Sequence, residues 1–129
     1  IHVAQQLGAD LAYIGTSFIA ARESLANDRY RQMLIDANAD DIVLTAEVTG
    51  IPANMLRQSL EGAGFSAGGK HEGGFNILRE METLKAWRDI WSAGHGVGDV
   101  QCVEGVAEIV QRFKDDYHAA RMGRPSATV

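Results

Sequence analysis

Cysteine and long hydrophobic runs are scarce in this sequence, and each scarcity excludes a class of protein. A single cysteine, Cys102, cannot form an internal disulfide or a multi-cysteine zinc site, and it is typical of a reducing compartment. No run of about eighteen apolar residues occurs, and no basic-then-apolar leader opens the printed chain. We therefore expect a cytoplasmic protein with no membrane partner, in which the Cys102 thiol is a small core hydrophobe.

Positive charge is also in short supply. The 129 residues include 12 Lys and Arg against 17 Asp and Glu, a net charge of -5, and the basic residues are scattered along the chain. A nucleic-acid-binding surface needs clustered positive charge, so we expect no nucleic-acid partner. Hydrophobic residues make up 46% of the chain, enough for the core of one ordinary domain. Residues 1–129 are therefore interpreted as a single region.

The stretch from Leu11 to Phe18 is the most informative part of the sequence. Leu11 to Ile14 has the length of a short buried strand, and Gly15 and Thr16 follow where a strand would pass into a loop. In parallel sheets ligands bind at the carboxyl ends of the strands, where glycine lets the backbone approach an anion and threonine adds a hydroxyl donor. Gly15 and Thr16 therefore fit either a phosphate site or a purely structural turn.

Helix and strand patterns alternate around this stretch, which predicts an α/β fold. Residues 1–7 are expected to be a helix closed by Gly8. Because this pattern begins in mid-helix at Ile1, we expect Ile1 to continue from an upstream segment. A second helix is predicted after Asn27 or Asp28, and its apolar face carries Tyr30, Met33, Leu34 and Ala37.

The middle of the chain predicts one extended segment and one helix. The extended segment has a two-residue period in which one face carries Ile42, Leu44, Ala46 and Val48. The helix is expected to open over residues 49–54, with Pro52 near its first turn, and to end at Gly62 and Gly64. Its apolar stripe would be Met55, Leu56 and Leu60, and Arg57 beside it is either exposed or in contact with an anion.

Residues 65–75 are rich in glycine, which favours a solvated loop or lid. The run does not match a phosphate-binding loop, because Lys70 is followed by His71 and not by Ser or Thr. His71 and Glu72 are adjacent on this loop without further metal-ligand residues, so we predict no metal site.

The last third of the sequence predicts two helices with a glycine-rich stretch between them. The helices are expected over residues 77–91 and 103–122, the second stopped by Gly123. Between them Gly94, Gly96 and Gly98 alternate with other residues, which brings the backbone close to another strand or to a flat ligand. His95 in this stretch is either an ordinary loop histidine or a catalytic one.

Several segments together resemble the nitronate monooxygenases, formerly called 2-nitropropane dioxygenases. Gly8-Ala9-Asp10 followed by Gly15-Thr16-Ser17-Phe18-Ile19-Ala20 resembles the family pattern "LGAD…GTRFLA". Residues 44–57 resemble "T…TG.PAN.LR", and residues 86–98 resemble "WRDIWSAGQGVG". The matches occur in the family's order and span nearly the whole chain. The sequence departs from the family at Ser17, where relatives have arginine, and at His95, where they often have glutamine.

The resemblance implies that the chain is the carboxy-terminal portion of a (β/α)₈ TIM barrel with helical and loop additions, and that its cofactor is FMN. By analogy, Leu11 to Ile14 is the last barrel strand, Gly15 and Thr16 hold the FMN phosphate, and Ser92 lies close to the flavin. The loops after the seventh and eighth strands build phosphate sites in such barrels, which agrees with this placement. A Gly-Gly motif and the family's catalytic histidine would lie upstream of Ile1, so we name no catalytic residue and expect these residues alone to be inactive.

The implied reaction is the FMN-dependent oxidation of an alkyl nitronate or nitroalkane, with oxygen as the second substrate. Two alternatives remain open. The first is a flavin-dependent enoyl-acyl-carrier-protein reductase of the same fold, which needs a nicotinamide donor. The second is a non-catalytic module that binds a phosphorylated ligand or a partner. A part of a barrel exposes unpaired strand edges, so we also expect a homo-oligomer or completion by the rest of the barrel.

Overall fold

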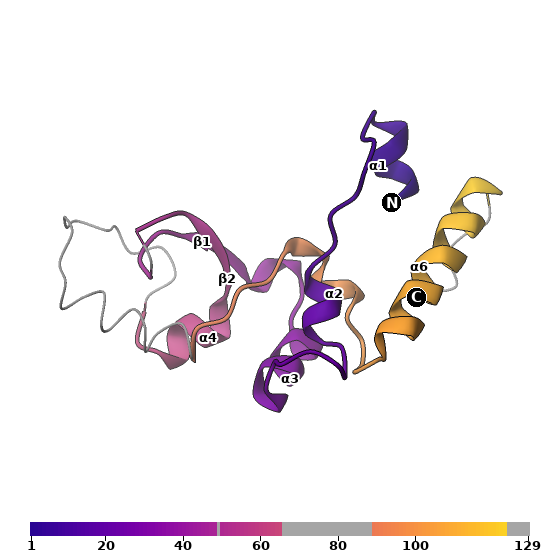
Figure 1. The fold of residues 1–129 in the computed structure, drawn as a ribbon. Helices are drawn as coiled ribbons and strands as arrows, with labels where there is room; N and C mark the ends of the chain where they lie inside the picture. Colours follow the sequence, from indigo (N-terminus) through magenta and orange to yellow (C-terminus); the bar gives the residue numbers. More distant parts are fainter. Residues whose placement is uncertain (49, 66–88, 124–129) are drawn as a thin grey trace.

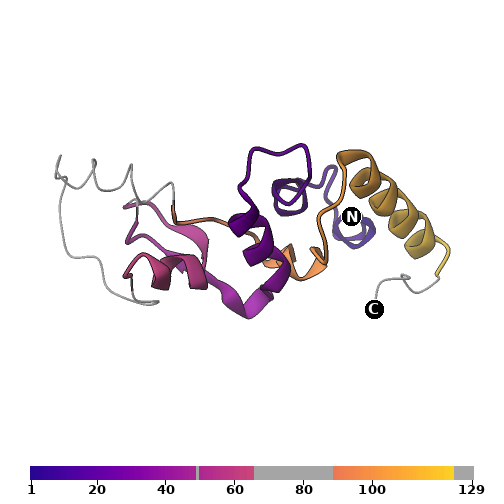
Figure 2. The ribbon, with the colours of Figure 1, turned by 90° about the horizontal axis from the view of Figure 1, so that it is seen from below.

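The computed structural model describes residues 1–48, 50–65 and 89–123. Figure 1 shows that these residues form an elongated arrangement, with the sheet and α4 at one end and the helices α1 and α6 at the other. Figure 2 shows the same separation from below. The elements in chain order are α1 (His2–Gln6), α2 (Thr16–Ile19), α3 (Asp28–Asp36), η1 (Ala39–Asp41), β1 (Ile42–Thr45), β2 (Ala53–Leu56), α4 (Arg57–Gly62), η2 (His95–Asp99) and α6 (Val106–Arg121).

Helix α3 forms where the sequence predicts it. The side chain of Asn27 accepts a 2.8 Å hydrogen bond from the backbone N–H of Tyr30, which satisfies one of the donors that open the helix. Met33 and Leu34 are buried on the predicted apolar face. Helix α3 thereby fixes one side of the main core, whose buried members are Ala20, Met33, Leu34, Ile42, Leu56, Trp91, Ala93, Val97 and Val100.

The described residues contain one sheet, in which β1 and β2 pair antiparallel. Ile42 lies opposite Leu56, and Thr45 lies opposite Ala53. The extended segment predicted from Ile42 onward is therefore confirmed over β1. Its apolar face is only partly buried, because Ile42 enters the core whereas Leu44 is 69% exposed.

The prediction of a helix that opens before Met55 is wrong for the first half of that helix. Met55 and Leu56 belong to β2, and the helix α4 begins only at Arg57. Pairing with β1 satisfies the backbone N–H and C=O groups of β2, a long-range effect that a local helical pattern does not contain. The predicted end is confirmed, since Gly64 follows α4 with a φ of 84°.

The expected strand over residues 11–14 is not formed. This segment connects α1 to α2 without regular structure, and Leu11 and Tyr13 are 90% and 101% exposed. A strand is stabilised by a neighbour that completes its hydrogen bonds, and the two strands in the described part of the chain pair with each other. The helix before this segment is confirmed as α1, followed by Gly8 with a φ of 92°.

Helix α6 confirms the predicted last helix, and a network of charged groups fixes its start. Both carboxylate oxygens of Glu23 accept hydrogen bonds from the backbone N–H of Val106, at 3.0 and 3.1 Å. Glu108 accepts hydrogen bonds from the N–H of Gly105 at 2.6 Å and from Arg22 at 2.7 Å. Gly123, with a φ of 67°, follows the helix as predicted.

The prediction that Cys102 is a core hydrophobe is wrong. Cys102 is exposed, as are its neighbours Gln101 and Val103, because this part of the chain is a surface connection from η2 to α6. The glycine-rich loop at 65–75 lies outside the described residues except for Phe65, and so does the helix predicted over 77–91 up to residue 88. No helix in the described part of the chain is long and apolar enough to cross a bilayer.

Candidate functional site

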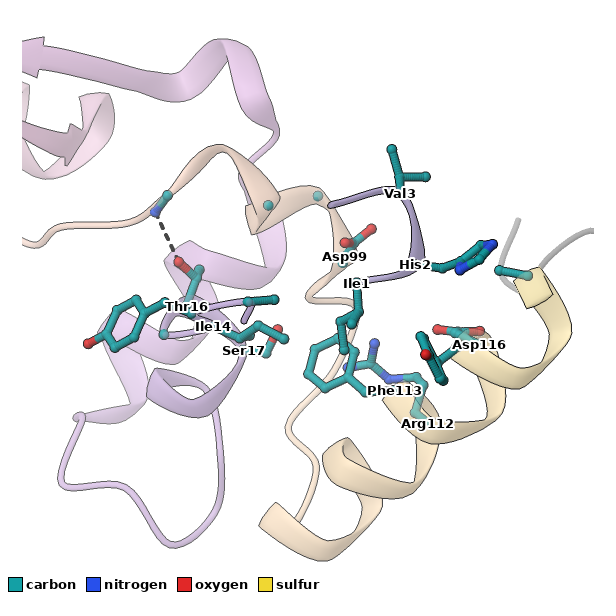
Figure 3. Close-up of a pocket in the computed structure, with 18 of the residues that line it drawn as sticks. Ile1, His2, Val3, Ile14, Thr16, Ser17, Asp99, Arg112, Phe113 and Asp116 are labelled. Atoms are coloured by element: carbon teal, nitrogen blue, oxygen red, sulfur yellow. Dashed lines mark hydrogen bonds between the residues drawn. The ribbon is translucent and has the colours of Figure 1, made fainter. Parts of the chain in front are cut away.

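A hydrogen bond joins the two segments that the sequence singled out. The side-chain oxygen of Thr16, at the start of α2, accepts a 2.9 Å hydrogen bond from the backbone N–H of Gly94, just before η2. Figure 3 shows this bond as the dashed line at one side of a pocket. The residue next to Thr16 is Gly15, which caps α2 and whose C=O accepts hydrogen bonds from Phe18 and Ile19. Two predicted contributors to the site, Gly15 and Thr16, are therefore brought against the glycine stretch.

The pocket has a volume of about 890 Å³ and lies between four parts of the chain, one of which is the start with Ile1, His2 and Val3. One wall is the connection before α2 with Gly15, Thr16 and Ser17, and a second is formed by Gly94, Gly96 and Gly98. Helix α6 supplies the opposite wall, from which Arg112, Phe113 and Asp116 extend in Figure 3.

The glycine wall offers bare backbone to the pocket. A Cβ atom at Gly94 would lie 3.4 Å from Oγ1 of Thr16, so the backbone here approaches the start of α2 and not the strand or flat ligand that the sequence suggested. Gly96 and Gly98 have no atom within 4 Å of the corresponding position. A ligand could therefore approach the backbone of η2 without displacing a side chain.

Two walls of the pocket carry carboxylates. Asp116 of α6 and Asp99, the last residue of η2, line the pocket together with Arg112 of α6. The guanidinium of Arg112 donates hydrogen bonds to Glu104 at 2.7 and 3.3 Å. The hydrogen bond to Glu104 raises the pKa of Arg112 above its ordinary value, against the effect of partial burial, and the charges of Asp116 and Asp99 add to the rise. Arg112 is thus already engaged by carboxylates, so an anionic ligand is better accommodated at the Thr16 side.

Ser92, the third predicted cofactor-binding residue, does not line this pocket. It lies two residues before Gly94, at the edge of the sheet, where it forms an isolated bridge with Met55. Its carbonyl accepts a hydrogen bond from the hydroxyl of Tyr30. The structure therefore brings Gly15 and Thr16 together with the segment that follows Ser92, and places Ser92 itself beside Tyr30.

Sequence reasoning missed Gly94 as the partner of Thr16, and it missed the polar residues of α6. The Thr16–Gly94 contact spans 78 positions, and no local pattern encodes such a pairing. The sequence predicted a helix over residues 103–122 and singled out neither Arg112 nor Asp116. His95 is exposed, and no three His, Cys, Asp or Glu residues among those described are grouped as a metal site would need.

Comparison with known families defines the class of this protein as a flavin-dependent oxidoreductase of a family whose members are generally TIM barrels. The chain belongs to the nitronate monooxygenase family, whose model matches residues 1–107. The resemblance found in the sequence motifs is confirmed. Neither the curated proteins nor the solved structures gave a significant match.

The match covers Gly15, Thr16, Ser92 and the glycine wall, and it ends near the start of α6. Apart from its first two residues, α6 therefore lies beyond the matched region. The described residues form a small mixed arrangement of helices with one antiparallel pair of strands. The TIM barrel is the general fold of the family, and the described residues do not themselves form a barrel.

Proposed function

We propose that this chain supplies part of the FMN phosphate site of an enzyme that oxidises alkyl nitronates or nitroalkanes with oxygen. Membership of the nitronate monooxygenase family supports the reaction class. The observation that supports the site is the contact of Thr16 with Gly94, which gathers a hydroxyl and bare glycine backbone at one side of a pocket.

The donors at this side of the pocket fit a phosphate group. The hydroxyl of Thr16 accepts from Gly94 and still carries a proton that it can donate. Gly15 and Ser17 line the pocket on either side of Thr16. A phosphate oxygen accepts a hydrogen bond from such a hydroxyl, and the carboxylates of Asp99 in η2 and Asp116 in α6 repel a phosphate from their parts of the pocket.

Apolar surface in the same pocket suits the ring system of a flavin. Ile14 and Phe113 line the pocket with Thr16, and Ser92 precedes the glycine wall by two residues. We propose that Ser92 lies near the bound flavin, which agrees with its place in the matched motif. When bound, FMN supplies the redox chemistry, whereas these residues hold the phosphate, orient the ring and exclude water.

No residue of this chain is proposed as the acid or base. His95 is exposed in η2 and does not line the pocket. The proposal therefore assigns binding and orientation to this chain, and proton transfer to another part of the enzyme. We further propose that the exposed segment 11–14 is covered by the remainder of a barrel or by a second copy.

Turnover by the native polypeptide, with its intact mass recorded, tests the reaction. The protein is loaded with FMN and given either an alkyl nitronate with oxygen or an enoyl thioester with NADH. We expect oxygen-dependent consumption of the nitronate only. Turnover of the thioester alone would identify an enoyl reductase. FMN binding without turnover of either pair, by a polypeptide well above the 14.0 kDa of these residues, would favour a phosphate-binding module.

A further inference from the structure

Residues 91–94, which lead into the glycine wall, are fixed to three other elements. The backbone N–H of Leu56 in β2 donates a 2.8 Å hydrogen bond to the C=O of Trp91. The N–H of Trp91 donates to the hydroxyl of Ser59 in α4 at 3.1 Å. At the other end, the N–H of Gly94 donates to Thr16. The path of the backbone between Trp91 and Gly94 is therefore constrained from both ends.

Tyr30 on α3 adds two contacts, with the first two residues of this segment. Its ring stacks on Trp91, with centroids 5.0 Å apart and planes inclined by 13°. Its hydroxyl donates a hydrogen bond to the carbonyl of Ser92. Tyr30 is thus the side chain through which α3 holds both Trp91 and Ser92.

We infer that Tyr30 is a positioning residue of the flavin site, which acts by fixing the backbone of Ser92 and thereby that of Gly94. This inference rests on the proposed function, because the proposed function places Ser92 and Gly94 at the flavin site. Tyr30 does not line the pocket, so it acts through the segment and touches no ligand.

The chemistry of Tyr30 suits this role. Burial raises the pKa of its hydroxyl above the ordinary value of 10.0, against the smaller effect of its hydrogen bonding with Ser92. The hydroxyl therefore remains a donor throughout the neutral pH range. Because the carbonyl of Ser92 can only accept, a protonated hydroxyl is the form that holds it.

The substitution Tyr30→Phe separates the two contacts, since phenylalanine keeps the ring on Trp91 and removes only the hydroxyl. The matched control is Thr45→Val, which removes a hydroxyl that accepts a 3.1 Å hydrogen bond from the N–H of Glu47 in the distant sheet region. Both variants lose one hydroxyl and one hydrogen bond to backbone, so a general loss of stability affects them alike.

Two readouts test the inference on the native polypeptide that carries these residues. Amide hydrogen exchange at Gly94, measured without flavin, reports whether the segment is still held. The dissociation constant for FMN and the visible circular dichroism of the bound flavin report whether the flavin site depends on how this segment is held. For Tyr30→Phe we expect about five-fold faster exchange at Gly94, about five-fold weaker FMN binding and an altered flavin spectrum. Thr45→Val should match the wild type in all three.

The outcomes separate this inference from the proposed function. If the wild type binds FMN and Tyr30→Phe matches it in exchange, affinity and spectrum, Tyr30 is not a positioning residue, although the FMN site stands. If Thr45→Val changes the flavin spectrum as much as Tyr30→Phe does, the effect is general destabilisation and the inference is overturned. Absence of FMN binding by the wild type would contradict the proposed function, and the inference with it.

Discussion

The hydroxyl of Thr16 and the backbone N–H of Gly94 are joined by a 2.9 Å hydrogen bond across 78 positions of sequence. This bond connects the start of α2 to the start of η2, and both border the same pocket. Since the hydroxyl uses a lone pair for Gly94, its proton is left for a ligand. The folded chain therefore gives Thr16 two roles, one toward its own backbone and one toward the proposed phosphate.

The substitution Thr16→Val should weaken FMN binding by roughly ten- to one-hundred-fold. A hydrogen bond to a charged group contributes about 1.5–3 kcal/mol, and valine keeps the shape of threonine without its hydroxyl. Fluorescence titration of FMN measures the change. Thr16→Ser is the matched control, because it retains the hydroxyl and should bind within a few-fold of wild type. Equal affinities for the valine and serine variants would remove Thr16 from the site.

The substitution Ser59→Ala should destabilise the fold by about 1–3 kcal/mol, because a buried donor loses its partner. Ser59 is 2% exposed, and its hydroxyl accepts from the N–H of Trp91 while donating to the C=O of Leu56 at 2.7 Å. Urea unfolding followed by tryptophan fluorescence measures the loss. Ser24→Ala removes a 2.6 Å hydrogen bond to the C=O of Ile19 at a partly buried position, so its effect should be smaller. A larger effect at Ser24 would contradict this account.

Glu108 should make the fold sensitive to acid. The N–H of Gly105, and secondly the ion pair with Arg22, lower the pKa of Glu108 below its ordinary value of 4.5. A lowered folded-state pKa means that the stabilisation is present above pH 4.5 and is lost as pH falls through the folded-state value. Thermal unfolding at a series of pH values below 5 should show a smaller acid loss for Glu108→Gln than for wild type. Parallel curves for the two proteins would show that Glu108 does not contribute to the loss of stability in acid.

The chain should associate as its concentration rises. Leu7, Leu11 and Tyr13 are almost fully exposed in the connection that follows α1. Grouped exposed apolar residues drive association. Sedimentation velocity over a hundred-fold concentration range should show a rising mean sedimentation coefficient, which Leu11→Lys combined with Tyr13→Lys reduces. A monomer at every concentration would argue that the exposed segment 11–14 is not an association surface.

Local patterns predicted the helices better than the strands. Asn27 and the spacing of Met33 and Leu34 specify α3 within its own sequence, and Gly123 marks the end of α6 in the same way. The strand β2 was missed because its residues pair with β1, whose position a helical window does not contain. The strand expected at residues 11–14 failed for the converse reason, since its composition is apolar but the described strands do not pair with it.

The motifs selected two residues that line the pocket, but they could not predict how the pocket is assembled. Gly15 and Thr16 stood out because glycine and threonine after an apolar run suit an anion, and they do line the pocket. Their meeting with Gly94 depends on how the 91–94 segment is held by Tyr30 and Ser59, a set of contacts between elements distant in sequence. The assignments of Gly15 and Thr16 to the phosphate and of Ser92 to the flavin remain predictions.

Comparing FMN with riboflavin on the native polypeptide tests the central claim most directly, because the two ligands differ only in the phosphate. Isothermal titration in the same buffer gives both dissociation constants. If Thr16 and the surrounding backbone hold the phosphate, FMN should bind at least ten-fold more tightly than riboflavin, and Thr16→Val should reduce that ratio with little effect on riboflavin. Equal affinities for the two ligands, unchanged by Thr16→Val, would contradict the account.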